Sequence, residues 1–291
     1  MAYDCVVLVK QVPDTKAVTA KAMNDDGTVN RGALPAIFNP EDLYALELAL
    51  RIKEQHGGAV SVITMGPPSA ADVLREALFR GADRTILITD RRCAASDTLA
   101  TSYILSCAVR KLKKFDIVLC GRQAIDGDTA QVGPQLAEKL NLPQVTYVEE
   151  LLDIQADALT VRRNTGVGWE KIRAPLPVLL TVMDTADQPR PPAARRMMKF
   201  KNARSPGELN KNPALETQNL ASLQKKGLLI EQWNLDDIDA DLSRCGQQGS
   251  PTVVQRIQSV VLAAGDYKNV EPNDTGIRHM VRELIEDHTI G

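Results

Sequence analysis

Short apolar runs alternate with longer segments of helical periodicity through roughly the first half of the chain. Four runs rich in β-branched residues have the length and composition of buried strands, at 5–9, 60–64, 85–89 and 116–120. Strands of this kind, separated by helical segments, are typical of a parallel sheet covered by helices on both faces. The pattern therefore predicts an α/β fold with a doubly wound, mostly parallel sheet.

Three helices are predicted as the connections between these strands. The first begins after Asn39, which can act as its N-cap with Pro40 in the first helical position, and it ends near Gly57. The second opens at Ser69 and ends at Gly81, and the third covers about 97–113. All three helices fit one doubly wound scheme.

The pattern changes after Pro143. Residues 158–163 and 169–173 flank a glycine-rich turn and indicate an antiparallel hairpin, and a buried strand follows at 178–182. We expect the hairpin at one edge of the sheet, with strand 178–182 extending the parallel part there.

The C-terminal part has little regular pattern until an amphipathic helix at 274–287. Its apolar content is too sparse for an independent core. We therefore predict a nucleotide-binding α/β domain over residues 1–205. Residues 206–291 are predicted as an arm whose terminal helix packs on another chain.

Composition and charge narrow the possible partners and the compartment. The 291 residues are 44% hydrophobic and carry a net charge of -2, which gives no general attraction to nucleic acid or anionic membranes. No apolar run approaches the roughly 20 residues of a membrane span, and residues 1–10 lack the features of a secretory signal. Five scattered cysteines without a Cys-x-x-Cys pair argue against a metal site or a disulfide framework. Cytoplasm is the expected compartment.

The segment most suggestive of chemistry is the loop 121–134, directly after the fourth predicted strand. It leads into a helix predicted from Gln135, so it lies at the carboxyl edge where open α/β sheets bind ligands. Its small residues, the Thr129 hydroxyl and the helix N-terminus could donate hydrogen bonds to the phosphate of an adenine nucleotide. An ordinary glycine- and aspartate-rich loop is the alternative. The sequence contains neither a Walker A nor a G-x-G-x-x-G motif, which argues against a P-loop NTPase or a standard Rossmann dehydrogenase.

Several stretches together resemble the beta (small) subunit of electron-transfer flavoproteins. They are 10–14, 65–68, 81–84 and the loop 121–134, in this order and spacing. The segment 162–180 is similar to the signature hairpin of that family. The resemblance covers residues 3–200, and a weaker likeness to the tail of some members occurs at 249–252.

The resemblance implies an adenine nucleotide held between the ends of the first two strands and the loop after the fourth. Carried over residue by residue, it points to Leu8, Asn39, Pro40, Glu41, Asp42, Met65, Arg122, Gln123, Ala124, Ile125, Asp126, Gly127, Asp128, Thr129, Ala130, Gln131, Val132 and Gly133. A structural role is the alternative for three of them. Leu8 and Met65 could be core residues, and Asn39 could be only a helix cap.

Two branches of the family differ in what fills this pocket. Most beta subunits hold AMP as a structural ligand, whereas the electron-bifurcating branch holds a second FAD. The hexapeptide 97–102 resembles the Asp-Thr-x-Ala-Thr-Ser pattern of the bifurcating branch, which adds Asp97, Thr98 and Thr101 to the candidate cofactor-binding residues. Leu99 departs from relatives that carry an aromatic residue there. The alternative is that Thr98 and Thr101 only begin a helix.

The function implied by the resemblance is electron transfer in a heterodimer with an FAD-containing alpha subunit. No catalytic acid, base or nucleophile is expected. The bifurcating version would oxidise NADH and reduce both the alpha-subunit FAD and a low-potential acceptor, ferredoxin or flavodoxin. The AMP version would carry single electrons from a dehydrogenase of the acyl-CoA dehydrogenase or a related type. A nucleotide-binding regulatory α/β protein is a rival from another class, but it explains neither the hairpin nor the arm.

The resemblance also implies a docking segment for the dehydrogenase at 184–198. Family members often dock through one exposed apolar anchor, and Ala186 stands at that position here. The basic run that contains Arg190, Arg195 and Arg196 could instead steer an acidic partner by long-range attraction. A solvated loop without a partner is the alternative.

Overall fold

The computed structural model describes residues 1–14, 34–211, 220–252 and 269–286. Contacts divide the chain into two units, Met1–Gln255 and Arg256–Gly291, and each is described by itself. No helix in the described ranges is both long enough and apolar enough to cross a membrane.

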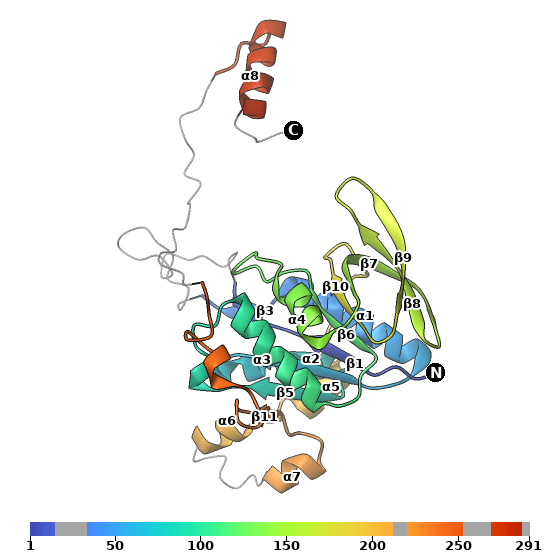
Figure 1. The fold of residues 1–291 in the computed structure, drawn as a ribbon, viewed down its shortest axis with the longest axis vertical. Coiled ribbons are helices and arrows are strands. Elements are labelled where there is room, and N and C mark those ends of the chain that lie inside the picture. The colour runs from blue at the N-terminus through green and yellow to red at the C-terminus, as the bar shows by residue number, and fades with distance from the viewer. Residues whose placement is uncertain (15–33, 212–219, 253–268, 287–291) are drawn as a thin grey trace. The chain divides into compact units, whose positions relative to one another are not determined.

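A nine-stranded sheet forms the centre of the first unit, in the order β11-β5-β4-β1-β6-β10-β7-β8-β9 (Figure 1). The strands are β1 (Cys5–Leu8), β4 (Val60–Met65), β5 (Arg84–Ile88), β6 (Ile117–Gly121), β7 (Gln144–Gln155), β8 (Ala158–Asn164), β9 (Trp169–Pro175), β10 (Val178–Val182) and β11 (Glu231–Trp233). From β11 to β7 neighbouring strands are parallel, and β8 and β9 continue antiparallel. The predicted α/β class with a mostly parallel sheet and an antiparallel hairpin at one edge is confirmed.

Helices cover both faces of this sheet. One core cluster contains residues of α1 (Pro40–His56), α2 (Ala71–Arg80) and α5 (Ala194–Phe200), and the other contains residues of α3 (Thr98–Lys111) and α4 (Val132–Leu140). Two short helices, α6 (Pro206–Lys211) and α7 (Leu220–Lys225), lie near β11 (Figure 1). Successive strand residues point to opposite faces, so Val7 packs with α1 and α2 whereas Val6 packs with α3 and α4. A separate antiparallel pair, β2 (Gln11–Pro13) and β3 (Ala36–Phe38), follows the end of β1.

Strand β7 is one of two strands of the sheet, with β11, that the sequence pattern does not predict. It lies outside β10, so β10 is an internal strand between β6 and β7 and not the last parallel strand. The register of β7 shifts against both of its neighbours, and Tyr147 has a φ of 59°. These irregularities break the period of two by which a strand is recognised.

The first unit extends to Gln255 and does not end at residue 205. Strand β11 pairs with β5, and Trp233, Leu235 and Ile238 are buried in the cluster that contains α3. A strand of three residues and a few separate apolar side chains give no periodic signal, although they bury well against a sheet that already exists. In the second unit, the predicted terminal helix is present as α8 (Asp274–Glu286).

Helix termini differ from the predicted caps in three places. Asn39 occupies the N-cap position of α1 but makes no capping hydrogen bond with its side chain. Ser69 lies in a 3₁₀ turn, Pro68–Ala70, and α2 begins only at Ala71. Helix α4 begins at Val132, three residues before the predicted start, which moves its N-terminus into the loop 121–134.

Candidate functional site

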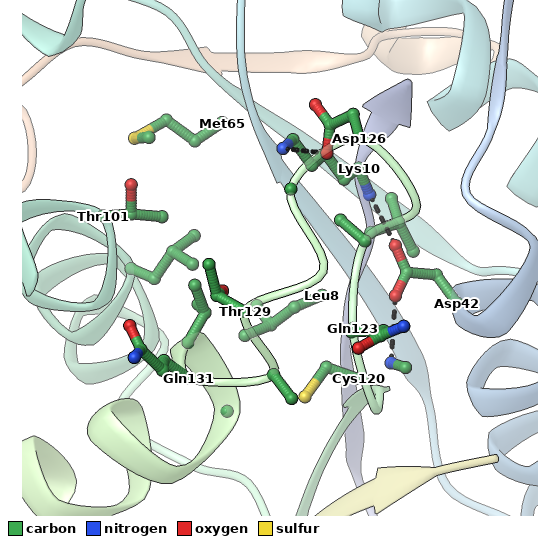
Figure 2. Close-up of a pocket in the computed structure, with 18 of the residues that line it drawn as sticks. Leu8, Lys10, Asp42, Met65, Thr101, Cys120, Gln123, Asp126, Thr129 and Gln131 are labelled. Atoms are coloured by element: carbon green, nitrogen blue, oxygen red, sulfur yellow. Dashed lines mark hydrogen bonds and ion pairs between the residues drawn. The ribbon is translucent and has the colours of Figure 1, made fainter. Parts of the chain in front are cut away.

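A cavity of about 350 Å³ lies at the carboxyl ends of β1, β4 and β6 (Figure 2). Strand β4 pairs with one edge of β1 and β6 with the other, so the strand order reverses at β1. The cavity therefore lies at the topological switch point, where doubly wound sheets bind ligands. Thr101 from α3 and Met65 from β4 contribute to one side of it, and Lys10 and Asp42 to another.

Most of the predicted binding residues line this cavity. They are Leu8, Asp42, Met65, Thr101, Arg122, Gln123, Ala124, Asp126, Gly127, Asp128, Thr129, Ala130, Gln131, Val132 and Gly133. The structure does not place Asn39, Pro40, Glu41, Asp97, Thr98 or Ile125 in its walls. Four of them, Asn39, Glu41, Asp97 and Thr98, are hydrogen-bonded to residues that do line it.

Eight lining residues are not among the candidates named one by one from the sequence, although Gly121 belongs to the predicted loop. They are Val9, Lys10, Cys93, Ala95, Ser96, Leu105, Cys120 and Gly121. Four of them lie at the carboxyl ends of predicted strands, where open α/β sheets bind ligands, so the sequence could have identified them. These four are Val9, Lys10, Cys120 and Gly121. The other four lie on α3 or in the loop before it, where no local pattern indicates an inward direction.

The first turn of α1 holds the loop that follows β6. The Asn39 amide donates to the Gln123 carbonyl at 2.9 Å, and the backbone N–H of Ile125 donates to Asn39 Oδ1 at 3.1 Å. Glu41 accepts from the backbone N–H of Gln123 at 3.1 Å and from Arg122 Nη2 at 2.6 Å. Asn39 and Glu41 therefore fix the course of the loop without facing the cavity.

Asp42 joins the ends of β1 and β6. Its carboxylate accepts from the backbone N–H of Gly121 at 2.9 Å and of Lys10 at 2.8 Å (Figure 2). Burial of this side chain raises its pKa to about 7, although the two backbone hydrogen bonds act in the opposite direction. Asp42 is thus a buried acid in the cavity wall that can change charge near neutral pH.

The loop presents unused backbone donors to the cavity. Asp128 and Ala130 have left-handed φ values of 48° and 52°, separated by Thr129. Alternation of this kind directs successive N–H groups into a concave nest that suits an anion. Among the described residues, no acceptor is found for the N–H groups of Thr129, Ala130, Gln131 or Val132. The nest continues into the N-terminus of α4, where the helix dipole also favours negative charge.

Both cations in the cavity wall already have acidic partners. Lys10 Nζ lies 2.7 Å from Asp126 Oδ1, and Arg122 pairs with Glu41 and lies 5.9 Å from the centre of the Tyr147 ring. Arg122 Nε is buried without a hydrogen-bond partner among the described residues. The donor set fits the phosphate of a nucleotide, and it does so mainly through backbone N–H groups.

Of the residues 97–102, which resemble the pattern of the bifurcating branch, one lines the cavity and others hold neighbouring residues in place. Asp97 caps α3 by accepting from the N–H groups of Leu99 and Ala100. The Thr98 hydroxyl donates to Gln131 Oε1 at 2.8 Å, and only Thr101 reaches the cavity wall. The Leu99 side chain is exposed and lies outside the lining.

The predicted docking residues are mostly attached to the body of the unit. Ala186 packs against the core, and Arg190 pairs with Glu47 at 2.8 Å and also with Glu54. Arg196 donates to two backbone carbonyls of the α2 region, at 2.6 and 2.7 Å. Arg195 is exposed at the start of α5.

The fold and the cavity define a doubly wound α/β protein with a ligand-sized cavity at the switch point of its sheet. Residues 26–205 match the electron transfer flavoprotein domain. The chain is 39% identical to an electron transfer flavoprotein subunit beta of Clostridium acetobutylicum, over 98% of this chain and 99% of the relative. It is 41% identical to Protein FixA of Sinorhizobium fredii, over 96% and 91% of the two chains. An acryloyl-CoA reductase electron transfer subunit gamma of Anaerotignum propionicum is 38% identical over 98% of both chains.

This chain belongs to the electron transfer flavoprotein family, and its likeness to beta-type subunits extends over nearly its whole length. The family resemblance seen in the sequence is confirmed. Electron transfer in a flavin-containing complex is therefore the function of the chain at the level of the family.

Proposed function

We propose that this chain binds a nucleotide cofactor in the cavity at the switch point and works as a heterodimer with an FAD-containing alpha subunit. The main support is the row of unused N–H groups in the loop after β6, which continues into the N-terminus of α4. Thr129 would add a hydroxyl donor for the phosphates. Leu8, Met65 and Leu105 would supply apolar contacts. We place the complex in the cytoplasm.

The cofactor that we propose in this cavity is FAD, and the pair would then act by electron bifurcation. The pattern Asp97-Thr98-x-Ala-Thr-Ser supports this choice, since Thr101 lines the cavity and Thr98 binds Gln131, which also lines it. When bound, FAD would supply hydride exchange with NADH and single-electron exchange with the alpha-subunit flavin and with ferredoxin or flavodoxin. The protein's part is to hold, orient and shield the group.

AMP is the second candidate for the same cavity. A volume of about 350 Å³ is near the lower end of the range for ligand pockets, and this favours a mononucleotide. With AMP here, the heterodimer would be a simple single-electron carrier for a dehydrogenase of the acyl-CoA dehydrogenase or a related type.

We expect two FAD molecules per alpha–beta pair, released by denaturation and quantified by chromatography. One FAD and one AMP per pair would select the simple carrier. Thr129→Ala should weaken retention of the nucleotide by roughly tenfold, because a hydrogen bond to a charged group contributes about 1.5–3 kcal/mol. Thr165→Ala in the hairpin turn, away from the cavity, is the matched control. Unchanged affinity in Thr129→Ala would contradict our placement of the phosphates.

The alpha subunit is the partner we propose for α8. The helix carries Ile277, Met280, Val281 and Ile285 at positions i, i+3, i+4 and i+8, and these side chains are 38–51% exposed. A helix of 13 residues is marginal on its own in water, so burial of this apolar stripe on another chain would stabilise it.

The dehydrogenase would dock near Ala186 and the basic residues that follow it, among which Arg195 is exposed. Arg195→Glu should slow electron transfer from the dehydrogenase several-fold at low ionic strength, and the deficit should shrink as salt screens the attraction. Arg190 and Arg196 are unsuitable for this test because they are bonded to the body of the unit. Lys171→Glu on β9 provides a charge-matched control. The same rate and salt dependence in Arg195→Glu and in the parent would show that this arginine does not steer the partner.

A further inference from the structure

Two short motifs that are far apart in the sequence meet beside the cavity. Thr252 donates to Asp97 Oδ2 from its hydroxyl at 2.7 Å and from its backbone N–H at 3.1 Å. The backbone N–H of Asp97 donates to Ser250 Oγ at 2.8 Å. Residues 249–252, which share a likeness with the tail of some family members, are therefore bonded to the first residue of the pattern 97–102.

Asp97 uses more of its hydrogen-bonding capacity than a helix cap requires. Oδ1 accepts from the N–H groups of Leu99 and Ala100, at 2.9 and 3.0 Å, which completes the cap of α3. Oδ2 and the backbone N–H remain, and both are taken by the C-terminal segment. Burial opposes the charged carboxylate, but the hydrogen bonds from Ala100, Thr252 and Leu99 outweigh it and lower the pKa of Asp97.

The C-terminal segment that carries Ser250 is itself firmly seated. Ser250 is 9% exposed, and its hydroxyl donates to the Gly246 carbonyl at 2.7 Å. Gly246 has a φ of 57°, and a Cβ at this position would lie 2.2 Å from the carbonyl oxygen of Arg92. The segment thus packs with its backbone directly against the loop before α3. Arg244, over the Tyr103 ring at 3.9 Å, ties the same segment to α3.

The residues next to Asp97 form a wall of the cavity. Ala95 and Ser96 precede it and line the cavity, and Thr101 lines it one turn later. The backbone N–H of Thr101 donates to the Asp97 carbonyl at 2.9 Å. On the other side, Thr98 joins this wall to Gln131 and hence to the loop with the unused N–H groups. Any shift of Asp97 would therefore move residues that line the cavity from two directions.

We propose that Ser250 and Thr252 form a latch on Asp97 that positions the cavity wall 95–101 and thereby sets the affinity for the nucleotide. Ser250 and Thr252 are positioning residues because neither lines the cavity. The inference rests on the proposed function of the cavity. It assigns the residues 249–252 to the same site as the pattern 97–102.

Removing the latch should weaken nucleotide binding without removing any group from the cavity. The double variant Ser250→Ala/Thr252→Val keeps the volume of Thr252 and deletes both hydroxyls. We expect its dissociation constant to rise roughly tenfold, since both hydrogen bonds that these hydroxyls make with Asp97 are lost. Thr252→Val alone should have a smaller effect because Thr252 is exposed. Thr252→Ser keeps the hydroxyl that Thr252→Val removes, so it should bind with the affinity of the parent.

The experiment uses the full alpha–beta complex depleted of nucleotide and titrated with AMP and, separately, with FAD. Hydrogen exchange at the Thr101 amide reports on the wall itself and should become faster in the double variant. Ser243→Ala is the matched control, because it removes a 2.7 Å hydroxyl–carboxylate hydrogen bond from the same segment, to Asp241 and not to Asp97. If Ser250 and Thr252 had a purely structural role, the double variant would have a lower unfolding midpoint but the same dissociation constant as the parent.

The outcomes separate the latch from the binding site. If Thr129→Ala weakens binding while the double variant binds like the parent, the latch is refuted and the site stands. If the parent complex binds neither AMP nor FAD, or Thr129→Ala changes nothing, the proposed site is refuted and the latch with it. Weaker binding in the double variant, recovery in Thr252→Ser and no change in Ser243→Ala would support the latch.

Discussion

Gly121→Ala should lower the free energy of unfolding by about 3 kcal/mol, seen as a lower urea midpoint. A Cβ on Gly121 would lie 2.6 Å from Asp42 Oδ1 and 2.8 Å from both Asp42 N and Glu41 C. Two of these three atoms belong to the backbone at the start of α1, so no side-chain rotation can relieve the clash. The first turn of α1 would move away from β6, and the hydrogen bond from Gly121 N–H to Asp42 would be lost with it.

Gly127→Ala is the matched control in the same loop. No atom of residues 1–14, 34–211, 220–252 or 269–286 lies within 4 Å of where a Cβ on Gly127 would stand, and its φ is not positive. The free energy of unfolding should therefore stay within about 0.5 kcal/mol of the parent. A loss of nucleotide affinity in this variant would then report on the approach of the ligand and not on the fold. Equal midpoints for Gly121→Ala and the parent would show that α1 and β6 can separate at little cost.

The parallel sheet could be predicted because its strands are buried on both faces. All four residues of β1 are buried, and strands of this kind appear in the sequence as continuous apolar runs. Strand β7 has bulges and charged residues, and β11 has only three residues, so neither produces a run or an alternation. Their places in the sheet depend on the neighbours they pair with, which a local pattern does not contain.

The cavity could be predicted on the side formed by the loop after β6, because that loop follows a recognisable strand at the carboxyl edge. The role of Asn39 could not, since the capping preference of asparagine is local whereas its actual partners, Gln123 and Ile125, are more than 80 residues away. The contact of Ser250 and Thr252 with Asp97 spans 153 and 155 residues, respectively. Tertiary contacts at such separations decide how the cavity is supported, and only the folded chain reveals them.

Asp42 should make the protein less stable as the pH rises from about 4 to about 7. Its pKa is raised from 3.8 to about 7, chiefly by burial. Between these two pH values the folded state therefore holds a proton that the unfolded state has released. The stabilisation from this group is complete below the unfolded pKa and is lost as the pH rises through the folded pKa. A shift of about three pKa units corresponds to about 4 kcal/mol between the two ends of this window.

Asp42→Asn should abolish this pH dependence, because an amide does not titrate. Carboxylates such as Asp90, whose pKa is lowered to about 2 chiefly by its hydrogen bonds with Arg92, make the opposite contribution at more acidic pH. The quantity to measure is therefore the difference in free energy of unfolding between parent and variant, from urea titrations at successive pH values between 4 and 8. Asp72→Asn, which removes an exposed carboxylate from the first turn of α2, controls for the loss of a charge near a helix N-terminus.

The difference between parent and Asp42→Asn should change by several kcal/mol in favour of the variant as the pH rises to 7 and then become constant. A difference that stays the same at every pH would mean that Asp42 is charged in the folded protein throughout, and that its two backbone hydrogen bonds outweigh its burial.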